Sequence, residues 1–467
     1  MKITTNNQPN GSVILITLLT GFVVGLTLAS YLTMVSVQNQ STLRSLAWNS
    51  SVPTTEAGVE EALTALYYYG TTNLVTGGWV NNVDGFWHKT GDLGSGYSYD
   101  VGIKPPVVGG PDRATIESFG YAPAPANLAT SYLSPYGMIL GGLVPTYSPT
   151  VVSAKRKVRV MAQRQSPLNY AMLAKGMIDL NGNNIATDSF DSTDPKKSGT
   201  GGKYDASKSA DKGDVATNLG IVDSINVGNA DIRGHVSTGP GGSVAVGSNG
   251  AIGDKDWVTY NNGIEPGWVS DDANVDIPDA KIPRDFSTNA RTPTAGKTEY
   301  PAGSGNFYDY VLFSADYRIK DFKGTVLVVG AARVLVESSF NFSGADGITI
   351  SSGASLQVYV APASASLGGN GVQNQGDAMS FIYWGLNSNT TLSFGGNSTF
   401  TGVIYAPYAD FKLGGSGSGN YDFVGAAVIR TVTMTGHFHF HYDESLARRF
   451  PIQQYVVYSW NDINPNN

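Results

Sequence analysis

The chain has 467 residues, a formal net charge of −7 and no cysteine. The acidic balance argues against nucleic acid as a partner. The absence of cysteine excludes a cysteine nucleophile and fits an exported bacterial protein that uses no disulfide bonds. Glycine, asparagine, serine and threonine are abundant, whereas lysine and arginine are few, which agrees with export.

A membrane-spanning helix is the first element that we expect, over residues 12–37. No residue from Ile3 to Thr42 carries a charged side chain, and residues 13–37 are apolar apart from scattered Thr, Ser, Gly and Tyr. About 20 such residues cross a bilayer core of roughly 30 Å. A cleavable secretory signal has a basic front and a shorter apolar run, of about 7–15 residues. We therefore expect a short leader over residues 1–11 and a single-pass protein of the inner membrane, with its C-terminal body outside the cytoplasm.

Residues 38–165 are predicted to form a helix packed on a small antiparallel sheet. Pro53 is expected to interrupt the helix, because proline lacks the donor N–H. The second helical stretch has an apolar face at Val59, Ala62, Leu63 and Leu66. Alternation of apolar and polar residues predicts strands over residues 97–103, 114–119 and 158–162.

The densest positive patch of the chain lies in the last of these strands, at Lys155, Arg156, Lys157 and Arg159. Alternate residues of one strand point to opposite faces of a sheet. We therefore interpret the patch as a solvated strand end and not as a nucleic-acid site.

The N-terminal region resembles that of the PilX-type minor pilins, a family of type IV pilus assembly. The resemblance lies in Gly11 before the apolar helix, the polar continuation of that helix, and the sequence Glu56-Ala57-Gly58. It implies a pilin-like headpiece, cleavage between Gly11 and Ser12 by a pilin-type peptidase, and other pilin-like subunits as partners. The chain departs from major pilins at Ile16, where they carry a glutamate.

A hidden repeat predicts a parallel β-helix over residues 166–443. Leu392-Ser393-Phe394 recurs as Phe411-Lys412-Leu413 and as Val432-Thr433-Met434, and Gly402–Ala406 recurs as Gly425–Ile429. Two interleaved strand types with one period indicate one coil per period. A β-sandwich is the alternative, but its hairpin strands lack such self-similarity. Residues 187–212 and 271–305 are expected to be excursions from the coils.

Residues 444–467 are predicted to close the last coil with a capping helix and a tail strand. Asp443 is a candidate N-cap, Glu444 lies in the first turn, and Arg448 and Arg449 lie in the last turn before Pro451. The segment from Gly402 through the histidines also resembles β-helical C-terminal domains that follow pilin-like N-termini.

Candidate metal ligands lie in three places. His437, His439 and His441 alternate along one strand, but same-face residues are about 6–7 Å apart, too far for three of them to reach one ion easily. Two further sets, in loops or at corners, match no complete calcium signature. These are Asp188, Asp191 and Asp194, and Asp179 with Asn181 and Asn183. We therefore predict no metal site, and no cofactor.

The fold class that these patterns predict is mainly β, with a transmembrane helix, a small pilin-like α+β headpiece and a β-helix body. No catalytic motif is present, and we expect a non-catalytic structural or adhesive protein whose partners are the membrane, pilin-like subunits or surface carbohydrate. One alternative is a membrane-tethered, carbohydrate-binding or carbohydrate-active β-helix; the aromatic residues suited to stacking on sugars are Trp257, Tyr260, Trp268 and Trp384. Another is a scaffold that faces the cytoplasm.

Overall fold

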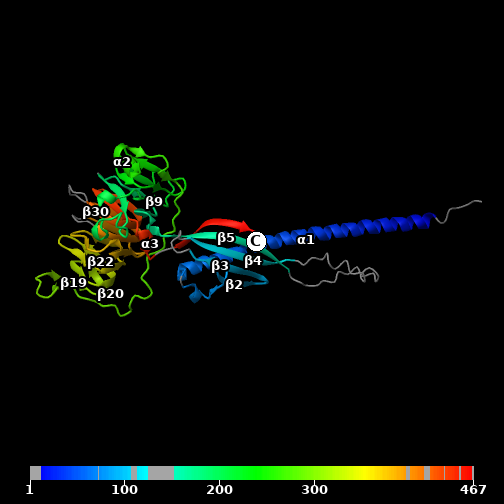
Figure 1. Ribbon diagram of the computed structural model, residues 1–467, viewed down its shortest axis with the longest axis horizontal. Helices are drawn as coiled ribbons and strands as arrows, with labels where there is room; N and C mark the ends of the chain where they lie inside the picture. Colours follow the sequence, from blue (N-terminus) through cyan, green and yellow to red (C-terminus); the bar gives the residue numbers. More distant parts are fainter. Residues whose placement is uncertain are drawn as a thin grey trace, which may run out of the picture. The chain divides into compact units, whose positions relative to one another are not determined.

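The computed structural model describes residues 12–71, 73–106, 113–124, 152–182, 184–395, 400–414, 421–435, 437–451 and 454–464. These residues divide into two compact units, one of residues 1–164 with 454–467 and one of residues 165–453, which we call the body. The chain is mainly β with a long apolar N-terminal helix, as predicted. Figure 1 shows the elements of each unit.

The helix α1 runs unbroken from Ser12 to Tyr69. Its first part is apolar and exposed, and by length and composition it is able to cross a membrane. The expected break at Pro53 is wrong, because the proline lies inside the helix. Ser51, Thr54 and Thr55, which flank it, are buried, and packing of this part outweighs the cost of about 3 kcal/mol that an internal proline carries.

An antiparallel sheet packs on the second part of α1. Its strand order is β1-β2-β3-β4-β5-β32, and the C-terminal strand lies beside β5 (Figure 1). The strands are β1 (Val80–Asn81), β2 (Trp87–Gly94), β3 (Tyr97–Lys104), β4 (Arg113–Ala124), β5 (Val152–Gln165) and β32 (Gln454–Ile463), with the short helix η1 (Leu74–Gly77) before β1. The three predicted strands lie within β3, β4 and β5. The predicted apolar helix face forms the core of this unit with Val101, Ile116 and Val160.

Gly58 lies at a close approach of α1 to β4. A Cβ at this position would collide with the hydroxyl of Ser118, which donates a hydrogen bond of 2.8 Å to the carbonyl of Thr55. The glycine of the Glu56-Ala57-Gly58 sequence therefore has a packing role, because it lets the helix backbone lie against the sheet.

We expect Gly58→Val to destabilise this unit by about 1–3 kcal/mol, since overpacking forces the helix away from β4. Hydrogen exchange of the β4 amides measures the change. Glu60→Val is the matched control, because Glu60 is exposed on the same helix and receives the same β-branched side chain. Equal exchange rates in the two variants would contradict the packing role of Gly58.

The body consists of short strands that pair in parallel. In the N-terminal half they are β6 (Met172–Ala174), β7 (Ile178–Asp179), β8 (Ala186–Phe190), β9 (Val215–Thr217), β10 (Ile225–Gly228), β11 (Asp231–Arg233), β12 (Val236–Ser237), β13 (Val244–Val246), β14 (Ala251–Gly253), β15 (Gly263–Ile264) and β16 (Val269–Ser270). Short helices interrupt them at η3 (Pro167–Asn169), η4 (Thr200–Gly202), η5 (Ala206–Lys208) and α2 (Lys255–Tyr260).

The C-terminal half continues with longer strands. They are β19 (Tyr310–Leu312), β20 (Ala315–Phe322), β21 (Thr325–Val328), β22 (Ala331–Phe342), β23 (Gly347–Ile350), β24 (Ser355–Val360), β25 (Ser364–Leu367), β26 (Val372–Asn374), β27 (Phe381–Gly385), β28 (Thr391–Phe394), β29 (Phe400–Leu413), β30 (Tyr421–Met434) and β31 (Phe438–Asp443). The helices here are η6 (Ala378–Ser380) and α3 (Leu446–Arg449), and β17 (Thr298–Glu299) pairs with β18 (Phe307–Tyr308) in a separate antiparallel hairpin.

The parallel pairings form three series. The first runs β16-β12-β9-β6-β30-β29-β27-β24-β22-β20. The second runs β13-β10-β7-β30-β29-β28-β25-β22-β20. The third runs β15-β14-β11-β8-β31-β30-β29-β26-β23-β21-β19. One continuous apolar core lies between them.

Residues that are aligned by the sequence repeat pair with one another on neighbouring strands. Leu392 pairs with Phe411, and Phe411 pairs with Val432. Gly402 likewise pairs with Gly425. The residues that the repeat aligns are therefore neighbours on adjacent strands.

The last strands of the body pair with its first strands. β30 pairs with β6 and β7, and β31 pairs with β8. The predicted helical cap of the last coil is therefore wrong, because the open edge of this coil is covered by β6–β8. Asp443 is the last residue of β31, α3 begins after Ser445, and the tail strand β32 joins the sheet of the other unit.

The predicted excursion of residues 271–305 carries the chain from one end of the series to the other. Near its start, the amide of Ala273 donates to the carbonyl of Thr238 beside β12. Further along, the hydroxyl of Tyr405 in β29 donates to the carbonyl of Pro278 at 2.7 Å. Near its middle, Arg333 in β22 binds the carboxylate of Asp285 with two contacts of 3.0 Å.

Candidate functional site

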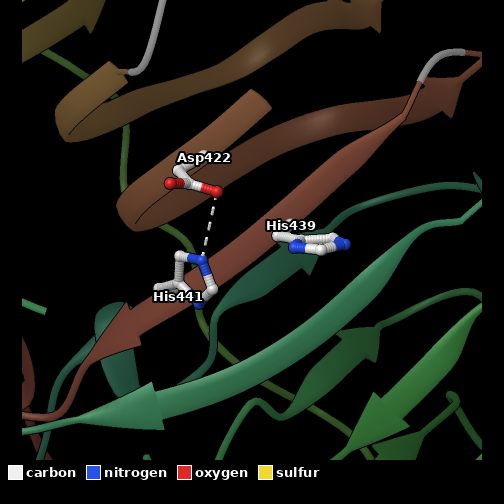
Figure 2. Close-up of side chains that lie close together, drawn as sticks. All are labelled: Asp422, His439 and His441. Atoms are coloured by element: carbon white, nitrogen blue, oxygen red, sulfur yellow. Dashed lines mark ion pairs between the residues drawn. The ribbon is translucent and has the colours of Figure 1, made fainter. Parts of the chain in front are cut away.

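Three possible metal-ligating side chains meet on β30 and β31, where β31 pairs with β8. Asp422 in β30 and His439 in β31 are register partners, and His441 follows two residues later on the same strand. One donor atom from each of the three side chains lies within 4.8 Å of the others. Figure 2 shows these side chains together, with Asp422 and His441 joined by an ion pair. We call Asp422, His439 and His441 the histidine–aspartate cluster.

Asp188 on the adjacent strand β8, together with Tyr204, fixes the orientation of the His441 ring. His441 Nδ1 lies 2.6 Å from Asp188 Oδ1, and Asp188 is the register partner of His441 on β8. The hydroxyl of Tyr204 donates to the other oxygen of Asp188 at 2.6 Å, and the Tyr204 ring stacks on the imidazole with centroids 3.6 Å apart. His441 Nε2 points toward Asp422 Oδ1, 3.5 Å away.

The two histidines of the cluster have opposite pKa shifts. Burial lowers the pKa of His439, and the neighbouring His441 lowers it further. Burial also tends to lower the pKa of His441, but its contacts with Asp188 and Asp422 raise it overall. The contact with His441 lowers the pKa of Asp422. His439 is therefore the ring that remains neutral, with a free lone pair, at neutral pH.

The histidine row was only partly predicted. Phe438, Phe440 and Tyr442, which alternate with the histidines, are buried in the apolar core. His437 stays outside the cluster, and His441 is 5 % exposed. Sequence reasoning missed Asp422 and Tyr204. A signal for Asp422 was present, because Tyr421-Asp422-Phe423 and Phe438-His439-Phe440 share one pattern and pair in register.

The aspartates of the other two candidate sets make contacts within the protein. Asp191 binds Arg448 at 2.8 Å and accepts two hydrogen bonds from Thr193. Asp194 caps the amide of Lys196, so Asp188, Asp191 and Asp194 form no common site in the described part of the chain. Asp179 accepts a hydrogen bond from Asn226. The second set also includes Asn181, which is exposed, and Asn183, which lies outside the described residues.

The four aromatic residues suited to sugar stacking do not share one environment. Trp384 is buried and stacks on Tyr359 and Phe450. Trp268 stacks on His235, whereas Tyr260 is 85 % exposed at the end of α2. Trp257 lies half-buried within α2. These residues give no specific support to the carbohydrate-active alternative.

The positive patch of β5 is less solvated than predicted. Lys157 is buried and lies 3.0 Å from Glu117, which also binds Arg159 at 2.6 Å. Burial tends to raise the pKa of Glu117, but these two cations lower it overall. Arg156 pairs with Asp462 of β32, and Lys155 lies over Phe119. The patch is therefore part of an ion-pair network within the sheet.

A small pocket lies beside Tyr204 and the end of β31. Its lining includes Lys203, Tyr204, Asp377 and Asp443, and its volume is about 50 Å³. Ligand sites for drug-sized molecules are roughly 300–1,000 Å³, so this pocket is too small for a sugar ring. Asp443 Oδ1 accepts hydrogen bonds from the amides of Ser192 and Ser445, and within the described residues its other oxygen has no partner.

Comparisons with known proteins give one family model and one solved structure. A family model described as a domain of unknown function (DUF7305) matches residues 312–449. No curated protein matches the chain. Among solved structures, a crystal structure of the competence-associated pilin ComZ from Thermus thermophilus is similar at 11 % identity and a TM-score of 0.24, over 89 % of this chain and 98 % of that chain. A TM-score this low does not establish a shared fold.

Proposed function

We propose that the chain is a membrane-anchored, exported, non-catalytic structural or adhesive protein, related to the minor components of type IV pili. The division of α1 carries the proposal. Its first part, residues 13–37, is apolar and exposed, and its second part is packed on an antiparallel sheet through Val59 and Ala62. One end of this helix packs on the sheet, and the other end is apolar and exposed. This division suits a protein that is anchored in a membrane.

In this proposal the body is a parallel β-helix. The three series of parallel pairings and the single apolar core support this interpretation. The partners would be the membrane, other pilin-like subunits or a surface carbohydrate, with the body outside the cytoplasm.

Topology tests the proposal, and the absence of native cysteine makes the test direct. Ser248 is exposed in the turn between β13 and β14, so Ser248→Cys introduces one accessible thiol. We expect a thiol reagent that does not cross the inner membrane to label this variant in cells whose inner membrane is intact. Permeabilising the outer membrane alone separates a surface body from a periplasmic one. Labelling only after rupture of the inner membrane would favour the cytoplasmic scaffold instead.

Processing between Gly11 and Ser12 is a further part of the proposal. Gly11 lies outside the described residues, and Ser12 is the first residue of α1. We expect mass spectrometry of the purified protein to find an N-terminal peptide that begins at Ser12. An intact Met1 terminus would indicate an ordinary signal anchor and would remove the main argument for assembly with pilin-like subunits.

A further inference from the structure

We propose that Asp422, His439 and His441 bind one divalent transition-metal ion at the junction of the last and first coils of the body. Two imidazole nitrogens and one carboxylate oxygen are a ligand set that suits Zn²⁺, with a fourth position open to water. The proposal is independent of the membrane and pilus assignments, because it depends only on side chains of β30, β31 and β8.

The separation of the donor atoms supports a bridging ion. Ligand bonds of about 2.0–2.2 Å in tetrahedral geometry place neighbouring donor atoms roughly 3.3–3.6 Å apart. His441 Nε2 and Asp422 Oδ1 are 3.5 Å apart, which is long for a hydrogen bond and suitable for two ligands of one ion. His439 comes from the position directly opposite Asp422, and one of its ring nitrogens lies within 4.8 Å of the other two donor atoms, so the His439 ring must move closer to complete the site.

The surroundings of His441 favour ligation through Nε2. Metal-bound histidines commonly donate their other ring N–H to a carboxylate, which fixes the tautomer and the ring orientation. Asp188 accepts from Nδ1 of His441, and Tyr204 holds Asp188 by a hydrogen bond and covers the imidazole face. Asp188 is thus a positioning residue contributed by β8, whereas the three ligands come from the adjacent strands β30 and β31.

A proton on Nε2 of His441 competes with the metal ion for this site. Without a metal, His441 placed between Asp188 and Asp422 is stabilised as an imidazolium, which accounts for the contact with Asp422. An ion that binds Nε2 must displace this proton. The metal ion would keep the contact between His441 Nδ1 and Asp188. It would also bind His439, which takes no part in the ion pair between His441 and Asp422.

Zn²⁺ binding to the full-length protein in detergent, without a polyhistidine tag, tests the proposal. After dialysis against Zn²⁺, elemental analysis is expected to find one equivalent more in the wild type than in His439→Gln or Asp422→Asn. His437→Gln is the matched control, since His437 directly precedes β31 and lies outside the cluster, and this variant is expected to retain that equivalent. His88, which contacts Asp84 and Asp100 through different ring nitrogens, is unchanged in all of these proteins.

The positioning role of Asp188 has its own readout. Asp188→Asn is expected to keep the Zn²⁺ equivalent at saturation but to weaken its affinity about 10- to 100-fold in a chelator competition. Added Zn²⁺ is expected to raise the unfolding temperature of the wild type and His437→Gln, but not of His439→Gln. Equal Zn²⁺ content in the wild type, His439→Gln and Asp422→Asn would overturn the proposal, and so would loss of the equivalent in His437→Gln.

Discussion

Replacing Met434 with aspartate is expected to lower the stability of the body by roughly 4 kcal/mol or more. Met434 is fully buried at the end of β30, opposite Leu413 in β29. An aspartate there places an unpaired carboxylate in an apolar core, which is among the few single changes with so large an effect. Thermal unfolding of the full-length protein, followed by hydrogen exchange of the β29 and β30 amides, measures the loss.

Thr433→Asp is the control for the same chemical group on the other face of the strand. Thr433 is half-buried and has Lys412 on one neighbouring strand and Asp179 on the other, so the new charge has one attractive and one repulsive neighbour. We expect a cost below about 1 kcal/mol. Equal shifts in unfolding temperature for the two variants would show that the faces of β30 are assigned wrongly.

Replacing Gly425 with alanine is expected to cost more than about 3 kcal/mol. Gly425 has a φ of +141°, and a Cβ there would overlap the carbonyl oxygen of its partner Gly402 on β29. The colliding atom belongs to the backbone, so it cannot rotate away as a side chain could. The collision is relieved only if β29 and β30 separate at this point. The unfolding temperature and the exchange of the β29 amides are the measurements.

Gly353→Ala separates the conformational cost from the steric one. Gly353 also has a positive φ, +78°, but no atom lies within 4 Å of its added Cβ, and the residue is exposed in a turn. We expect the usual cost of about 1–2 kcal/mol for a non-glycine residue in this region. If Gly425→Ala were no worse than Gly353→Ala, the close approach of β29 and β30 at this glycine pair would be incorrect.

The sequence was informative where neighbouring strands resemble each other. Phe411 and Val432 are register partners on the adjacent strands β29 and β30, so similar packing requirements leave similar residues, and the repeat predicts the register. The alternation in β4 was equally direct, because one face lies on α1 and the other does not. In both cases the pattern reflects the packing of a single strand or of two adjacent strands.

The sequence was uninformative where the cause is a distant partner. Nothing in Val428 and Leu173 shows that these residues pair, because they lie in opposite halves of the body and belong to no common repeat. The same limit hid Tyr204, whose ring stacks on His441, a residue more than 200 positions further along the chain. The continuity of α1 through Pro53 also depends on the sheet, which supplies packing that the helix alone lacks.

The pairing of the last strands of the body with its first strands has a consequence for folding. β6, β7 and β8 lie within residues 172–190, but the strands that cover one of their edges, β30 and β31, lie within residues 421–443 and are synthesised much later. Until then the early strands present unpaired backbone groups, which are a template for aggregation. The pairing between the two halves of the body therefore forms last, and a nascent chain that stalls before residue 421 keeps this edge unpaired.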